Sequence, residues 1–115
     1  MRPALLILAL PLLGASPAPI DLTVALDNFH FDPAVVRLHH GQPYLLHLVN
    51  RSEHGHNFAA PAFFAAAGSP MRAVEVAGGA SITVPLQAPS PGVYKLKCSH
   101  FTHAMRGMKG SIVVD

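Results

Sequence analysis

Residues 93–110 read VYKLKCSHFTHAMRGMKG. In the first six residues, Lys95 and Lys97 alternate with Tyr94, Leu96 and Cys98. This alternation places Tyr94, Leu96 and Cys98 on one face of a β-strand. We predict that this apolar face points into the protein, so that Cys98 is shielded from solvent at the end of the strand. The residues that follow Cys98 are expected to form a loop, which can bring His103 and Met108 back to the same point.

The two-residue alternation recurs along the chain and is typical of an antiparallel β-sandwich. Turns between the expected strands are predicted at residues 28–33, at Gly41, at the Gly78-Gly79 pair and at the cluster from Pro89 to Gly92. The one plausible helix, 61–67, is short and begins at a proline. Its Phe63 and Phe64 are expected in the core or over a functional site. The predicted strands are 20–26, 35–38, 44–50, 73–77, 81–86, 93–98 and 111–114.

The composition supports one folded domain and excludes several classes of protein. The 115 residues are half apolar and only 12% charged, which argues against intrinsic disorder. The formal net charge is +2 and no run of basic residues occurs, so we do not expect a nucleic-acid-binding protein.

Residues 1–18 resemble a secretory signal peptide. Arg2 precedes an unbroken apolar run, 4–10, and small residues follow from Gly14 to Ala18. The run is shorter than the roughly 20 residues that a membrane span needs. A buried N-terminal helix or strand is the alternative. The signal predicts an exported domain, 19–115, in the periplasm or a similar compartment, with no membrane span in the mature form. A free thiol tends to oxidise there, so Cys98 needs protection.

One cysteine stands beside eight histidines and four methionines. A single cysteine excludes an internal disulfide and a four-cysteine zinc site. The remaining possibilities for Cys98 are a free thiol, an intermolecular bridge, a nucleophile or one thiolate of a mixed cysteine–histidine site. Cys98, His103 and Met108 are spaced five residues apart, and with one more imidazole they would supply the donor set of a blue-copper centre. His56 is the candidate for that imidazole, just past the third predicted strand.

The sequence resembles the cupredoxins, small periplasmic proteins with a type 1 (blue) copper ion. The resemblance covers nearly the whole mature chain, and its specific parts are His56-Asn57-Phe58 and the Cys98, His103 and Met108 spacing followed by Lys109-Gly110. It implies a Greek-key sandwich of seven or eight strands with copper at one end. It also implies that His56, Cys98 and His103 are the strong ligands and that Met108 is the axial ligand. Asn57 would tie the two ligand segments together by a hydrogen bond.

Several residues compete with these assignments. Cys98 could be a small buried hydrophobe, whereas a nucleophilic role fits poorly because no catalytic cleft is expected on so small a chain. His54 lies two residues before His56 and could reach the same point, and Met105 is the rival of Met108. His100 is expected to be a loop residue or part of a second, weaker metal site. The remaining histidines are expected to be solvated or packed: His30, His39, His40 and His47.

The expected function is one-electron transport by a monomer that docks transiently with redox partner proteins near His103. A carrier or resistance protein that holds copper without redox cycling is the alternative, supported by the histidines beside the site. An enzyme is not expected, because four ligands on a single domain leave no open position for a substrate. The same cysteine and histidine donors would also suit zinc.

Overall fold

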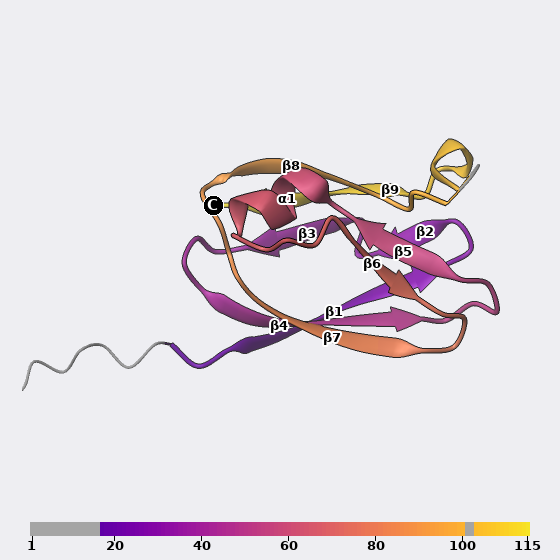
Figure 1. The fold of residues 1–115 in the computed structure, drawn as a ribbon, viewed down its shortest axis with the longest axis horizontal. Coiled ribbons are helices and arrows are strands. Elements are labelled where there is room, and N and C mark those ends of the chain that lie inside the picture. Colours follow the sequence, from indigo (N-terminus) through magenta and orange to yellow (C-terminus); the bar gives the residue numbers. More distant parts are fainter. Residues whose placement is uncertain (1–16, 101–102) are drawn as a thin grey trace, which may run out of the picture.

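The computed structural model describes residues 17–100 and 103–115 and shows two β-sheets packed face to face (Figure 1). Most of the predicted signal peptide, 1–16, lies outside the described residues. The predicted sandwich with one short helix is confirmed. The four-stranded sheet has the order β2 (His30–Asp32), β1 (Ile20–Asp27), β4 (Pro43–Asn50) and β7 (Ser81–Gln87). The five-stranded sheet has the order β3 (Val35–Leu38), β9 (Lys109–Val114), β8 (Gly92–Lys97), β5 (His56–Ala59) and β6 (Ala73–Val76).

The pairing of the strands is mixed, whereas the sequence pattern had predicted antiparallel strands. β1 runs parallel to β4, and β3 runs parallel to β9. Parallel neighbours cannot be joined by a tight hairpin, so the chain visits other strands before it returns to each pair. Alternation reveals which side chains face the core, but it does not reveal the direction of the neighbouring strand.

Of the nine strands that the structure describes, β2 and β5 were not among the predicted ones. Residues 28–33 were expected to form a turn, yet three of them pair with the end of β1. The segment is too short for alternation to show. All four residues of β5 are buried, and two polar residues, His56 and Asn57, are followed by the apolar Phe58 and Ala59, so polar and apolar side chains do not alternate along this strand.

The core between the two sheets is mainly aliphatic and includes four buried phenylalanines, Phe31, Phe58, Phe63 and Phe64. Phe58 contacts Phe31 and Phe64 edge-on at ring-centroid distances of 6.0 and 6.2 Å. Phe63 and Phe64 come from α1 (Pro61–Ala66) and are both buried, so they belong to the core. Figure 1 shows α1 toward the end of the sandwich that carries the C-terminus. The short 3-10 helix η1 (Ala104–Arg106) lies at the opposite end.

Gly110 allows β9 to approach the segment that enters β3. A Cβ atom added to Gly110 would overlap the backbone oxygen of Ala34, which cannot move without shifting the strand. We therefore expect Gly110→Ala to lower the free energy of unfolding by about 1–3 kcal/mol, measured by urea denaturation.

Gly92→Ala is the matched control in the paired strand, because its added Cβ would meet only ordinary contacts with the Tyr94 ring. Equal stability of the two variants would contradict this account of Gly110.

Candidate metal centre

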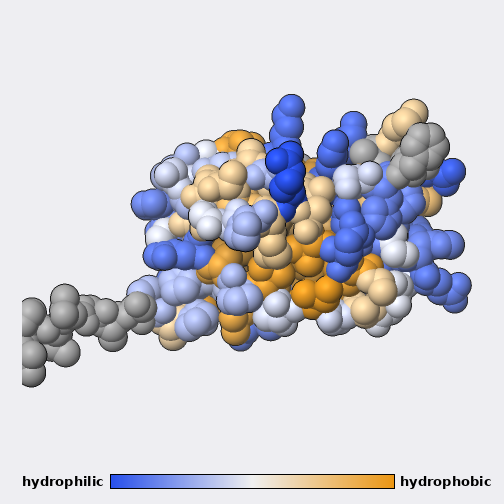
Figure 2. All heavy atoms as spheres, viewed as in Figure 1, coloured by the Kyte–Doolittle hydropathy of each residue, from blue (hydrophilic) through white to orange (hydrophobic). Residues whose placement is uncertain are grey.

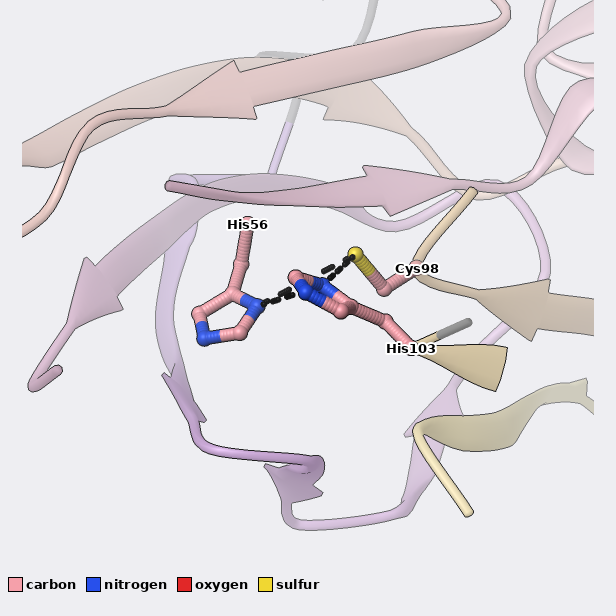
Figure 3. Close-up of side chains that lie close together, drawn as sticks. All are labelled: His56, Cys98 and His103. Atoms are coloured by element: carbon pink, nitrogen blue, oxygen red, sulfur yellow. Dashed lines mark hydrogen bonds between the residues drawn. The ribbon is translucent and has the colours of Figure 1, made fainter. Parts of the chain in front are cut away.

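His56, Cys98 and His103 converge at one end of the sandwich, where Figure 3 shows the three side chains pointing toward one another. His56 is the first residue of β5, and Cys98 follows the last residue of β8. The Nδ1 atoms of the two histidines are 3.2 Å apart. Sγ of Cys98 is 3.4 Å from Nδ1 of His103 and 4.0 Å from Nδ1 of His56.

These distances fit a single metal ion. One point in the plane of the three donor atoms is equally far from all of them, at about 2.1 Å from each. This distance is close to the metal–nitrogen and metal–sulfur bond lengths of about 2.0–2.3 Å known for zinc. Two imidazoles and one thiolate around such a point match the trigonal donor set of a blue-copper site. Among the residues that the structure describes, this is the one group of three or more histidine, cysteine or acidic side chains close enough to hold an ion.

The rings of His56 and His103 are suited to remain neutral. Burial lowers the pKa of His56, and the nearby His103, His100 and His54 lower it further. Burial also lowers the pKa of His103, with further contributions from His100 and Arg106. Because a metal binds the unprotonated imidazole, these shifts favour metal binding at neutral pH.

Asn28 orients His56 from the turn that joins β1 to β2. Its side-chain Oδ1 lies 3.1 Å from Nε2 of His56, so this ring nitrogen donates its hydrogen to Asn28 and leaves Nδ1 free to face Cys98. Asn28 could not be identified from sequence patterns. No spacing or motif links it to His56, which lies 28 residues later and meets it only through the packing of two strands.

Phe29, the next residue, covers the two histidines. Its ring lies edge-on to His56 and His103 at centroid distances of 6.3 and 5.2 Å. The Arg106 guanidinium carbon sits 4.8 Å from the centre of the same ring. The backbone φ of Phe29 is 103°, a conformation that costs a non-glycine residue about 1–3 kcal/mol. The surrounding contacts hold this strained turn against the candidate site.

Asn57 ties the two ligand segments together, as the resemblance to the cupredoxins implies. Its Oδ1 accepts a hydrogen bond of 2.8 Å from the backbone N–H of Ser99, and its Nδ2 donates to Ser99 Oγ at 2.7 Å. The backbone N–H of Asn57 also points at Sγ of Cys98, at 3.5 Å. Nδ2 donates a further bond of 2.8 Å to Oε1 of Glu75. These bonds fix the spacing between His56 and Cys98.

Of the two candidate methionines, Met108 is fully buried and Met105 is 85% exposed. The backbone N–H of Cys98 donates to the carbonyl oxygen of Met108 at 3.1 Å, and Met108 N–H donates to the carbonyl oxygen of His103, also at 3.1 Å. The backbone of Met108 is therefore bonded to two of the three converging residues, which keeps it at the same end of the sandwich.

The other histidines lie outside this group of three. His54 is exposed, and Nε2 of His100 is 2.7 Å from a carboxylate oxygen of Glu75. His39 and His47 contact the carboxylates of Asp115 and Asp21, each at 2.7 Å. His40 is 2.8 Å from the carbonyl oxygen of Pro89. His100 was expected to be a loop residue, with a second, weaker metal site as the alternative; among residues 17–100 and 103–115 it belongs to no second group of potential ligands, so that alternative gains no support.

Removing the acceptor on Asn28 should weaken metal binding. We expect Asn28→Leu to lower copper affinity about tenfold, because the His56 ring is then free to rotate or to change tautomer. The affinity is measured by competition with a chromophoric chelator. Asn28→Asp is the matched control, because it keeps an acceptor oxygen at the same place and should bind copper more tightly than Asn28→Leu. Identical affinities for both variants and the wild type would rule out this role.

Known proteins resemble the chain in fold. The profile of the cupredoxin-like domain matches residues 4–114. Auracyanin from Roseiflexus castenholzii superposes with a TM-score of 0.68 at 22% identity, covering 85% of this chain and 98% of auracyanin. Auracyanin A from Chloroflexus aurantiacus, described as a "blue" copper protein, gives 0.66 at 20% identity and covers 85% and 100%.

A larger protein also contains this fold. The blue copper oxidase of Nitrosomonas europaea gives a TM-score of 0.70 at 14% identity, and the match covers 85% of this chain but 39% of the oxidase. Among curated proteins, none matches the chain in sequence. The domain match spans nearly the whole chain, and the sandwich and the converging donor atoms agree with it. The chain therefore belongs to the cupredoxin-like family.

Proposed function

We propose that this protein carries single electrons between redox partners by means of one copper ion. Nδ1 of His56, Sγ of Cys98 and Nδ1 of His103 would be the strong ligands, and Met108 the axial ligand. The main support for the proposal is that the three donor atoms converge around a point about 2.1 Å from each of them. Copper bound there would supply a one-electron couple between Cu(I) and Cu(II).

The residues around the site keep its geometry constant. The side chains of His56 and Cys98 are 0% exposed, so water has little access to the thiolate. The side chains of Asn28 and Asn57 have no ionisable group, so their own charge would not change with the oxidation state of the copper, and their hydrogen bonds would help to hold the ligands in place. If His56, Cys98 and His103 hold copper in this arrangement, their donor atoms would move little between Cu(II) and Cu(I), which would keep the barrier to electron transfer low.

His103 is the proposed exit for the electron, because it is partly exposed, unlike His56. The nearby Met105 is 85% exposed and would give a partner an apolar contact beside it. A transient complex of a monomer with its partner needs only a small contact of this kind. With its four ligands in place the site would offer no position for a substrate, so we propose a carrier and not an enzyme.

The proposed location is the periplasm or another compartment reached by export, on the basis of residues 1–18. Among the described residues, no helix is long and apolar enough to cross a membrane. The alternative copper-delivery function draws less support from His100 than the sequence suggested, because His100 contacts Glu75 and lies outside the group of potential ligands.

Voltammetry of the copper-loaded protein tests the proposal. We expect a reversible one-electron wave and no transfer of copper to an excess of a moderate chelator during the measurement. A protein that loses its copper to the chelator, and shows no reversible wave, would be a copper carrier, and the electron-transport proposal would be wrong.

The two methionines give a finer prediction. Met108→Leu should keep the visible colour and raise the reduction potential, because loss of the axial thioether favours Cu(I), which tolerates low coordination. Met105→Leu is the matched control and should change the potential several-fold less, because Met105 is 85% exposed. Voltammetry of both variants provides the measurement, and equal shifts would mean that Met108 is not the axial ligand.

A further inference from the structure

The charged residues of the strands are divided between the two sheets. The strands of the four-stranded sheet carry Asp21, Asp27 and Asp32 and contain no lysine or arginine. The strands of the five-stranded sheet carry four cations and a single acid, Glu75. The cations are Arg37, Lys95, Lys97 and Lys109. The low net charge therefore conceals a strong separation of charge across the sandwich.

Every lysine of the sequence lies on the outer side of two neighbouring strands, β8 and β9. We call the surface formed by Lys95, Lys97 and Lys109 the lysine face; all three side chains are exposed. Lys97 and Lys109 are directly opposite in the register of the two strands. Like charges at such positions repel each other and destabilise the pairing. The ion pairs among the described residues involve no lysine, so this repulsion is not relieved within that part of the chain.

A shallow groove runs along the lysine face. It is lined by the three lysines together with Ala59, Pro61, Leu96 and Gly110. The groove arises because β5 pairs with β8 only at Ala59 and Lys97, after which the chain turns into α1 at Pro61. In Figure 2, hydrophilic side chains project from the edge of the molecule along which β8 runs in Figure 1.

We propose that the lysine face binds an acidic region on a redox partner protein. This inference rests on the proposed electron-transport function and adds a second docking surface to the one near His103. Lys97 directly precedes Cys98, and Lys109 directly follows Met108. A partner held there would lie one residue along the backbone from two of the proposed ligands. The charge separation would also orient the protein during the encounter, since local charge steers association even when the net charge is small.

An acidic protein surface is a better match for the lysine face than a nucleic acid is. The groove combines three cations with the partly exposed Pro61, over a floor formed by the buried Ala59 and Leu96, and protein interfaces have such a mixture of apolar contact and polar rim. Nucleic acid requires a broader basic surface than three lysines on a chain of net charge +2. An anionic membrane is the other occupant that the experiment must separate.

The first test maps binding on the copper(I)-loaded protein by NMR. We expect an oligoglutamate peptide to shift amide signals of β8 and β9 and an oligolysine peptide of equal length to leave them unchanged. The double variant Lys97→Gln/Lys109→Gln should bind oligoglutamate about tenfold more weakly. Arg37→Gln/Arg51→Gln is the matched control, because it removes the same charge from exposed positions outside the groove and should bind as the wild type does.

The second test measures the rate at which hexacyanoferrate(II), an anionic one-electron donor, reduces the copper(II) form. The rate constant should fall about tenfold in the lysine variant and much less in the arginine variant, with both visible spectra unchanged. Three results would overturn the proposal. The first is an equal loss of rate in both variants, and the second is a set of NMR signal changes confined to the His103 end. The third is binding to phosphatidylglycerol vesicles without binding to oligoglutamate. A lysine-dependent NMR map without any reversible copper couple would instead overturn the electron-transport function and leave the docking surface standing.

Discussion

Replacing Cys98 with serine should abolish the intense visible absorption that we expect when Cu(II) is added to the mature protein. Such absorption arises from charge transfer between a thiolate and copper, and Cys98 is the single cysteine in the sequence. Its sulfur lies within 4.0 Å of Nδ1 on both histidines. The measurement is a visible spectrum at full copper loading, with copper content determined separately.

The controls separate loss of the ligand from loss of the fold. Cys98 is fully buried, so a serine hydroxyl there costs about 1–3 kcal/mol if it finds no partner. Cys98→Ala avoids that cost and should be equally colourless, and circular dichroism should show that it remains folded. His54→Gln should keep the colour, because His54 lies outside the group of three. A colourless wild-type protein that is fully loaded with copper would contradict the type 1 assignment.

Replacing Asn57 with alanine should damage both stability and the metal site. The variant loses the hydrogen bonds to Ser99 and Glu75 and leaves the Ser99 N–H without its acceptor in a partly buried place. Removing one partner of a buried hydrogen bond lowers the free energy of unfolding by about 1–3 kcal/mol for each polar group left unpaired. The spacing between His56 and Cys98 should also relax, so we expect a shifted visible band together with a lower unfolding temperature.

Asn50→Ala is a matched control for the metal effect. Asn50 is also buried, and its side chain bonds to Ser52 and to the carbonyl oxygens of His54 and Val76, none of which is a proposed ligand. We expect a comparable loss of stability with a band close to that of the wild type. If both variants shift the band equally, the effect of Asn57 on the site is only a consequence of lower stability.

Local patterns in the sequence predicted a large part of this fold. The alternation along 93–98 predicted that Leu96 and Cys98 face inward, and both are buried. The same pattern located seven of the nine strands in the described part of the chain, because a half-buried strand must alternate between apolar and polar residues. It could not reveal β2, which has only three residues, or β5, which is buried on both faces.

The candidate site was predictable where its residues are close in sequence or belong to a motif. Cys98, His103 and Met108 share one loop, and the His56-Asn57-Phe58 triplet identified the second segment. Asn28 and Phe29 could not be predicted in this way. They reach His56 only because β1 and β2 end beside the start of β5, and no local pattern encodes that proximity.

The sequence by itself determined the chemistry available to this protein: one thiolate, its two imidazole candidates and the buried faces of most strands. Those properties depend on residue type and short spacing, which a chain carries before it folds. The tertiary structure alone decided the parallel pairing of β1 with β4, the contact of Asn28 with His56 and the gathering of all lysines on one face. These features depend on which distant strands become neighbours, and that choice is made by the packing of the whole core.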